Sequence, residues 1–349
     1  MRNVWILMTG ALWLLGHSGS AWAIKEDEFS TRYATDVRPT IEKNASVGAF
    51  LGKDGKRIEY LVVEPALEEG QQAPKGALII LPGRSESLYK YFEVAYDLRH
   101  LGLRLYLMEH RGQGASDRLI DDRQKGHVGN FQDYVDDLGT FLHQVVQKDG
   151  FQTVFVLAHS MGGTIATLYA EQHPADLSGL VVSSPMMQID TGKYNEAAAY
   201  LLTAGLTVVG KGQEYAPGFK PSNPAEEVFE TALETSSRPR WEMWRDLRLE
   251  RPELVLGGQT NRFCKESLEA TWQVQVEACQ LTVPMLLLQA GHDSYVKPDG
   301  QDRVCRRAAR CEKIRIEEGR HELLMDRDVV RDRAMDAIER FLTQRLSAN

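Results

Sequence analysis

The stretch VFVLAHSMGGTIATLYA, residues 154–170, joins an apolar, β-branched run to a run of small and helix-favouring residues. It predicts a buried strand that turns directly into a helix, with Ser160 at the turn and Gly162 and Gly163 just after it. A turn this tight strains its central residue, so its neighbours must be small, as Ala158 and Gly162 are. We therefore interpret Ser160 as a nucleophile at a sharp strand-to-helix elbow. The alternative, a serine that only caps the helix, does not require small residues on both sides.

Apolar strands and amphipathic helices alternate on both sides of this stretch. We expect strands at residues 59–65, 76–83, 103–110, 153–160, 177–185, 284–291 and 313–318. We expect helices at residues 89–102, 131–147, 161–173, 299–309 and 328–346. Apolar strands separated by helices are typical of a parallel sheet that is covered on both faces. The sequence therefore predicts an α/β fold whose mostly parallel sheet is flanked by helices.

The alternation stops between residues 187 and 278, where helical segments follow one another without clear strands. We interpret residues 187–278 as a helical cap inserted after the expected strand 177–185 of a core formed by residues 24–186 and 279–349. Apolar residues at helical spacing in this insertion are candidate walls of a substrate pocket: Leu201, Leu202, Trp241 and Trp244. The alternative for each of them is that it packs the cap onto the core.

A serine hydroxyl is a good nucleophile only when a base removes its proton, and the base is most often a histidine held by a carboxylate. In a parallel sheet these groups follow later strands, with the acid before the base. Asp293 is the first acid after the sixth of the seven expected strands, and His321 follows the last one. We therefore predict that Ser160, Asp293 and His321 form a catalytic triad.

Other residues near this acid and base have simpler explanations. His292 precedes Asp293, which is the wrong order for the base. Asp299 and Asp302 lie where a helix is expected to begin, and acidic residues are ordinary at that position. We therefore keep Asp293 as the predicted acid.

Attack of a serine on a carbonyl creates an oxyanion, which needs N–H donors directed at it. One donor is expected to be the backbone N–H of Met161, directly after the nucleophile. The second is expected from the loop after the strand 76–83, where Gly83 permits a close approach and Arg84 supplies the N–H. The alternative for Gly83 is a simple turn.

The composition is that of a soluble globular protein, with 43% hydrophobic and 26% charged residues among 349. The formal net charge is -8 and the basic residues are scattered, which argues against a nucleic-acid partner. Residues 1–23 have one early cation, a short apolar run and a final Ala-Trp-Ala, typical of a signal peptide cleaved after Ala23. We therefore expect an exported protein, periplasmic or secreted; the alternative is an uncleaved membrane anchor.

The four cysteines lie in the last third of the chain, and export would permit two disulfides. Proximity in the sequence favours the pairs Cys264–Cys279 and Cys305–Cys311 among the three pairings. The alternative is buried free thiols. The spacing of these cysteines does not match a metal site, so we expect no metal.

Several blocks of the chain resemble the serine α/β-hydrolases, and within them the lysophospholipase and monoacylglycerol lipase group. The blocks include LPGRSESLYKYFEVAYDLRHLG, EHRGQGASDRLIDDRQKGHVGNFQDYVDDL, LAHSMGGTIATLYAEQHP and GRHELLMDRD, and they cover most of residues 78–328. The resemblance implies an α/β-hydrolase fold, with the family's nucleophile, acid and base at Ser160, Asp293 and His321. Its oxyanion donors correspond to Arg84 and Met161. Relatives begin the oxyanion loop with His-Gly, whereas this chain has Pro-Gly, but the donor is a backbone group.

The resemblance implies a serine hydrolase that cleaves the ester of a single-acyl-chain lipid through an acyl-enzyme, with transient contact to a membrane surface. No cofactor is expected for this chemistry. A carboxylesterase or thioesterase for short, soluble acyl groups is the main alternative, because a fold does not choose a substrate. A non-catalytic binding protein on the same fold is a minor alternative.

Overall fold

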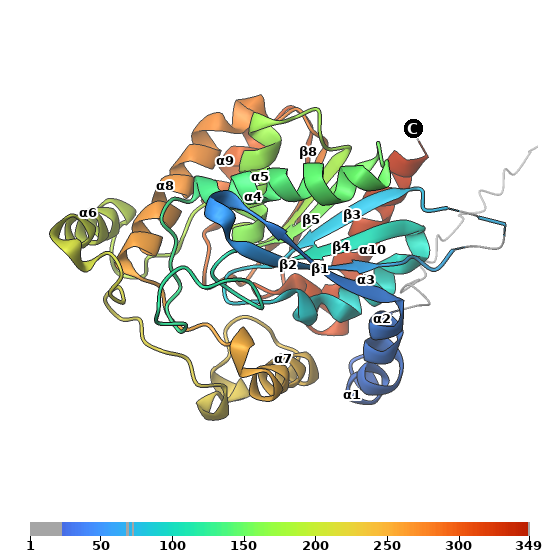
Figure 1. Cartoon of the computed structure of the whole chain (residues 1–349), viewed down its shortest axis with the longest axis horizontal. Helices are drawn as coiled ribbons and strands as arrows, with labels where there is room; N and C mark the ends of the chain where they lie inside the picture. Colours follow the sequence, from blue (N-terminus) through green and yellow to red (C-terminus); the bar gives the residue numbers. More distant parts are fainter. Residues whose placement is uncertain (1–22, 68–69, 72, 348–349) are drawn as a thin grey trace, which may run out of the picture.

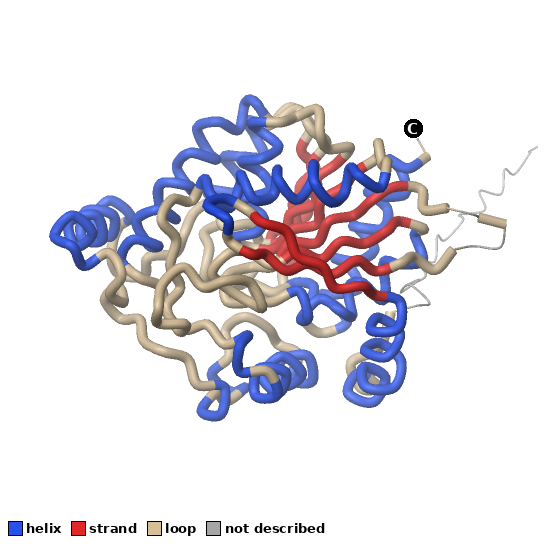
Figure 2. The backbone as a smooth tube through the Cα atoms, viewed as in Figure 1, coloured by secondary structure: helices blue, strands red, loops and turns tan. Residues whose placement is uncertain are grey.

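The computed structural model describes residues 23–67, 70, 71 and 73–347. The expected leader lies outside the described residues except for Ala23, so its cleavage stays a prediction. The described residues contain an 8-stranded sheet in the order β1-β2-β4-β3-β5-β6-β7-β8, drawn in red in Figure 2. The strands are β1 (Ala45–Leu51), β2 (Arg57–Val63), β3 (Gly76–Leu81), β4 (Leu103–Met108), β5 (Val154–His159), β6 (Gly179–Ser183), β7 (Met285–Ala290) and β8 (Cys311–Ile316).

Helices cover both faces of this sheet (Figure 1). One buried apolar cluster lies under α4 (Gln132–Phe141), α5 (Met161–Gln172), α8 (Asn261–Glu277) and α9 (Pro298–Arg307). A second lies under α1 (Phe29–Arg32), α2 (Arg38–Asn44), α3 (Phe92–Leu98) and α10 (Asp328–Leu346). The strands from β3 to β7 are buried along almost their whole length, as expected for strands that are covered on both faces.

The predicted fold class is confirmed: strands β4, β3, β5, β6, β7 and β8 pair in parallel. Strands β1 and β2 add an antiparallel edge. Sequence reasoning does not predict β1, because this edge strand buries only Phe50 and leaves Val47 and Leu51 exposed. Its apolar residues therefore do not give the pattern of a buried strand.

The segment between β6 and β7 contains α6 (Glu196–Leu206), α7 (Arg238–Glu250) and α8. Helices α6 and α7 lie at separate corners of the molecule (Figure 1). Arg240 attaches α7 to the core, because its guanidinium binds Glu93 at 2.9 Å and the carbonyl of Ile24 at 3.0 Å. Helix α8 packs on α5 and buries Ala270 and Val274 in the same cluster, so it completes the helical layer of the core. Within the described residues, no helix is long and apolar enough to cross a membrane.

Of the two expected disulfides, the Cys305–Cys311 bridge is confirmed and links α9 to the start of β8. The Cys264–Cys279 pairing is wrong, since both cysteines are free. Cys264 lies in the first turn of α8 and Cys279 lies just beyond its last residue. A helix rises about 1.5 Å per residue, which separates the two by roughly 20 Å. A disulfide requires Cα atoms within about 7 Å, so proximity in the sequence misleads where a helix intervenes.

Candidate active site

The junction of β5 and α5 is the sharp elbow that the sequence predicts. Ser160 has φ 49° and ψ -114°, a conformation that L residues rarely adopt. A Cβ atom at Gly162 would lie 2.5 Å from the carbonyl oxygen of Pro82, and one at Gly163 would lie 2.8 Å from the Cβ of Pro185. Both glycines are therefore required by close packing against the loops that follow β3 and β6.

The structure brings Ser160, His321 and Asp293 together from the ends of three different strands. Nε2 of His321 lies 2.9 Å from Oγ of Ser160, and Nδ1 lies 2.7 Å from Oδ2 of Asp293. Ser160 and His321 are both buried, at 9% and 7% exposure. These distances form a continuous hydrogen-bonded chain from hydroxyl to carboxylate, which is the arrangement that activates a serine.

Asp293 is held as a carboxylate in this position. Its Oδ1 accepts hydrogen bonds from the backbone N–H groups of Tyr295 and Val296, at 2.8 and 3.0 Å. Burial alone would raise the pKa of Asp293, but His321 and these two N–H groups lower it below its ordinary value. Asp302, one of the rival acids, instead binds Lys313 and Gln289.

The loop after β3 leaves one N–H group free beside the serine. The N–H of Gly83 binds Glu86 at 2.5 Å, and the N–H of Ser85 binds Gln113 at 3.3 Å. Between them, the N–H of Arg84 has no acceptor in the described part of the chain. A Cβ at Gly83 would lie 3.2 Å from the Cβ of Ser160, so this loop touches the nucleophile.

The N–H of Met161, at the first position of α5, likewise has no acceptor within the described residues. It is therefore available as an oxyanion donor, as is the N–H of Arg84.

Two buried charged residues, Glu86 and Lys90, and the partly buried Glu322 join the oxyanion loop to the base, and sequence reasoning missed all three. Nζ of Lys90 lies 2.7 Å from Oε1 of Glu86 and also binds Glu322, the residue after His321. Burial alone would raise the pKa of Glu86, but the charge of Lys90 lowers it, so Glu86 stays ionised. The signal in the sequence is the spacing of Glu86 and Lys90, one helical turn apart.

The motif EHRGQG, residues 109–114, also holds the oxyanion loop. Nε2 of His110 lies 2.9 Å from the carbonyl oxygen of Pro82, and burial lowers the pKa of His110 to about 4. Because the ring is neutral, Nε2 must carry the proton in order to donate a hydrogen bond to this carbonyl. Nε2 of Gln113 donates to the carbonyl of Gly83 at 2.8 Å. The motif therefore positions backbone groups and does not contact the serine.

The four residues expected to line a substrate pocket do not come together. Leu201 and Leu202 on α6 are exposed, at 69% and 46%. Trp241 and Trp244 on α7 are buried, and Trp244 packs with Leu254, Leu247, Tyr89 and Ala115. The alternative explanation, that a residue packs the cap onto the core, therefore describes Trp244 better.

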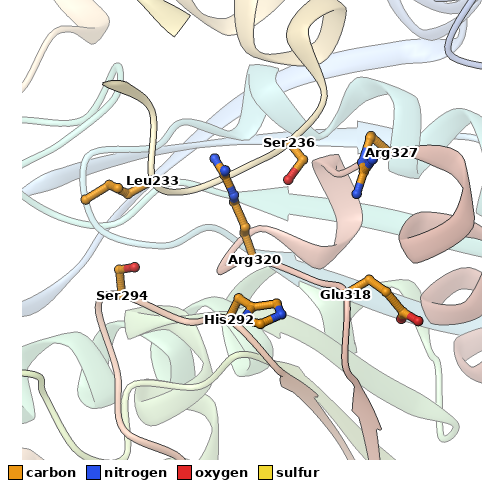
Figure 3. Close-up of a pocket in the computed structure, with 7 residues that line it drawn as sticks. All are labelled: Leu233, Ser236, His292, Ser294, Glu318, Arg320 and Arg327. Atoms are coloured by element: carbon orange, nitrogen blue, oxygen red, sulfur yellow. The ribbon is translucent and has the colours of Figure 1, made fainter. Parts of the chain in front are cut away.

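Two hollows lie between the cap segment, residues 187–278, and loops of the core. One of about 480 Å³ is lined by Leu233, Ser236, His292, Ser294, Glu318, Arg320 and Arg327 (Figure 3). His292, Ser294 and Arg320 adjoin Asp293 and His321 in sequence, whereas Leu233 and Ser236 come from the segment between β6 and β7. A smaller one of about 230 Å³ is lined by His127, Thr207, Gly210, Gly212, Gln213 and Arg262.

Residues 72–328 match the family model of the serine aminopeptidases, S33. The chain belongs to this family. Proteins that resemble this chain include lysophospholipase L2 of Escherichia coli strain K12, 34% identical over 276 residues, which are 76% of this chain and 80% of that protein. A probable lysophospholipase L2 of Haemophilus influenzae is 30% identical over 82% of this chain and 90% of its own length. The monoglyceride lipase of Rattus norvegicus is 28% identical over 65% of this chain and 68% of its own length.

Solved structures show the same α/β-hydrolase fold. A monoglyceride lipase from Saccharomyces cerevisiae matches with a TM-score of 0.68 and 18% identity, over 88% of this chain and 97% of that one. A monoacylglycerol lipase from Paleococcus ferrophilus matches with a TM-score of 0.62 and 20% identity, over 78% of this chain and 96% of that one. At these identities the likeness concerns the fold alone.

Proposed function

We propose that this protein is a serine hydrolase that cleaves the carboxylic ester of a single-acyl-chain lipid, a lysophospholipid or a monoacylglycerol. The observation that carries the proposal is the hydrogen-bonded chain from Ser160 through His321 to Asp293. The relatives named as lysophospholipases and monoglyceride lipases support the ester of a single-acyl lipid as the substrate.

In this proposal, Oγ of Ser160 attacks the ester carbonyl while Nε2 of His321 takes its proton. Asp293 holds the tautomer of His321 that carries its proton on Nδ1, and it stabilises the imidazolium that forms. The free N–H groups of Arg84 and Met161 bind the oxyanion. His321 then protonates the leaving alcohol, and water releases the acyl group by the same steps in reverse. These residues supply all the groups that the reaction needs, without a metal or organic cofactor.

The proposal includes transient contact with a lipid surface. Helix α6 and the turn that follows it leave four large apolar residues exposed, Leu201, Leu202, Val208 and Val209. An exposed apolar group of this kind on a cap is suited to shallow contact with lipid. We also propose export to the periplasm or beyond, supported by the leader-like residues 1–23 and by the Cys305–Cys311 disulfide, which persists in oxidising compartments. Mass spectrometry of the N-terminus of exported protein tests the expected cleavage after Ala23.

A panel of esters tests the proposed substrate. The panel contains lysophospholipids, monoacylglycerols and p-nitrophenyl esters of graded chain length, with Ser160→Ala as the inactive control. Each buried methylene contributes about 0.8 kcal/mol, so kcat/KM should rise steeply from acetyl to long acyl chains. An optimum at acetyl or butyryl would favour a short-chain carboxylesterase or thioesterase. Absence of Ser160 labelling by a fluorophosphonate would favour a non-catalytic protein.

A further inference from the structure

The side chain of Arg84, the residue after Gly83 in the oxyanion loop, has no counter-ion among the described residues. Its backbone belongs to the loop in which Gly83 touches Ser160. Its side chain is half-buried and donates one hydrogen bond, from Nη1 to the carbonyl of Gly257 at 3.0 Å. A guanidinium has several N–H donors in a planar fork, so most of the donors of Arg84 have no acceptor within the described residues.

The deeply buried arginines of the described chain, unlike the half-buried Arg84, bind carboxylates. Arg111 binds Asp133 and Asp137. Arg240 binds Glu93 and Asp328. Arg331 binds Glu93 and Asp97. For Arg84, the described residues provide no carboxylate within 4.0 Å. Burial lowers the pKa of Arg84, because no nearby anion offsets the loss of hydration. A partly buried cation without an anionic partner is costly, so its place in the loop that touches the catalytic serine needs an explanation.

The groups around Arg84 are uncharged acids. They are Tyr134, Tyr295 and Cys264, and burial raises the pKa of all three, that of Cys264 to about 12. The ring of Tyr295 lies 5.0 Å from that of His321, which places Arg84 and the base in one neighbourhood. Nη1 of Arg84 would also lie 3.4 Å from a Cβ at Gly126, and His127 lines the smaller hollow. None of these neighbours supplies a negative charge to Arg84, so an anionic ligand would meet no competing acid among them.

We propose that the guanidinium of Arg84 binds the phosphate of a lysophospholipid while the N–H of the same residue holds the ester oxyanion. This inference rests on the proposed function and selects the lysophospholipid from its two substrate classes. Along the glycerol unit, the phosphate is separated from the acyl ester by about as many bonds as the guanidinium is from its own backbone nitrogen. A planar guanidinium binds a phosphate through two parallel hydrogen bonds. A monoacylglycerol carries a hydroxyl at that position and offers no charge.

The test compares a lysophosphatidylcholine with a monoacylglycerol of the same acyl chain, both below their critical micelle concentrations. The quantity measured is the ratio of their kcat/KM values in the native enzyme, in Arg84→Gln and in Arg84→Lys. A charge-assisted pair predicts that Arg84→Gln lowers this ratio about tenfold to a hundredfold. Arg84→Lys should recover part of the loss, because it keeps the charge but not the fork. The ratio cancels any disturbance of the oxyanion loop, which both substrates use.

Arg118→Gln is the matched control. This arginine comes from a neighbouring loop and also donates to a carbonyl of the cap segment, that of Glu253, but backbone carbonyls satisfy its guanidinium. It should leave the ratio unchanged. An unchanged ratio in Arg84→Gln would overturn the inference and leave Arg84 a structural link to Gly257.

The inference and the proposed function fail in different ways. If the native enzyme hydrolyses neither substrate, the proposed function fails. If it hydrolyses both and only the effect of Arg84→Gln is missing, the inference alone fails. Inorganic phosphate is a second source of the same anion. If millimolar phosphate inhibits hydrolysis of the monoacylglycerol and Arg84→Gln leaves the ratio of kcat/KM values unchanged, Arg84 binds free phosphate. That result would overturn the role of Arg84 in binding the lipid headgroup.

Discussion

Replacing Asp293 by asparagine should move the proton of the neutral His321 ring from Nδ1 to Nε2. Oδ1 of Asp293 accepts the N–H groups of Tyr295 and Val296, so the amide oxygen of the variant must stay at that position. The amide NH₂ then faces Nδ1 of His321, where Asp293 has its Oδ2 at 2.7 Å. An NH₂ group only donates, so Nδ1 must become the acceptor and Nε2 must carry the proton. Nε2 then points a proton at Ser160 and cannot act as its base.

The wrong tautomer in a triad costs about 10⁴ in kcat. At about 1.4 kcal/mol for each factor of ten, this is a loss of roughly 5 kcal/mol of transition-state stabilisation. The assay is kcat on a p-nitrophenyl ester, with thermal unfolding to show that the fold is kept. Asp302→Asn is the matched control, because Asp302 binds Gln289 and Lys313 and should leave kcat within about twofold. A variant Asp293→Asn that keeps a tenth of the native kcat, or a larger loss in Asp302→Asn, would refute this reasoning.

Three further predictions concern stability. Gly162→Ala should lower the free energy of unfolding by about 1–3 kcal/mol and lower activity, because its Cβ would lie 2.5 Å from the carbonyl oxygen of Pro82. Gly205→Ala, where nothing lies within 4 Å of the added Cβ, should have neither effect. Equal effects of the two substitutions would contradict the packing argument. Cys305→Ser should cost about 2 kcal/mol in denaturant unfolding of oxidised protein, whereas Cys279→Ser, which removes an exposed free thiol, should cost nothing measurable. Burial raises the pKa of Glu171 to about 9, so folding favours its protonated form and stability is lost as pH rises from about 4.3 toward 9. Glu171→Gln should therefore raise Tm more at pH 9 than at pH 5, and a gain that does not depend on pH would argue against a buried, ionising Glu171.

The sequence predicts much of the candidate site because its parts follow local rules. The small residues around Ser160 indicate a strained strand-to-helix turn. The alternation of strands and helices predicts that Asp293 and His321 lie at the same edge of the sheet. The hydrogen-bonded distances among these three side chains agree with that placement. What holds the loops is less visible, since Lys90 connects Glu86 to Glu322 across more than two hundred residues of chain.

The sequence by itself predicts the strands from β2 to β8 and the helices that alternate with them in the core, because a buried parallel sheet needs continuous apolar runs separated by amphipathic helices. It also favours the Cys305–Cys311 disulfide, whose partners are joined by a short connection, but the same argument from proximity fails for Cys264 and Cys279. Only the tertiary structure decides that α8 belongs to the core layer, that α6 and α7 lie apart, and that Cys264 and Cys279 stay free. Only the tertiary structure shows that Arg84 has no carboxylate partner among the described residues, because its neighbours come from distant parts of the chain. A local pattern shows which face of an element is apolar, but the partner of that face or of a charge depends on long-range packing.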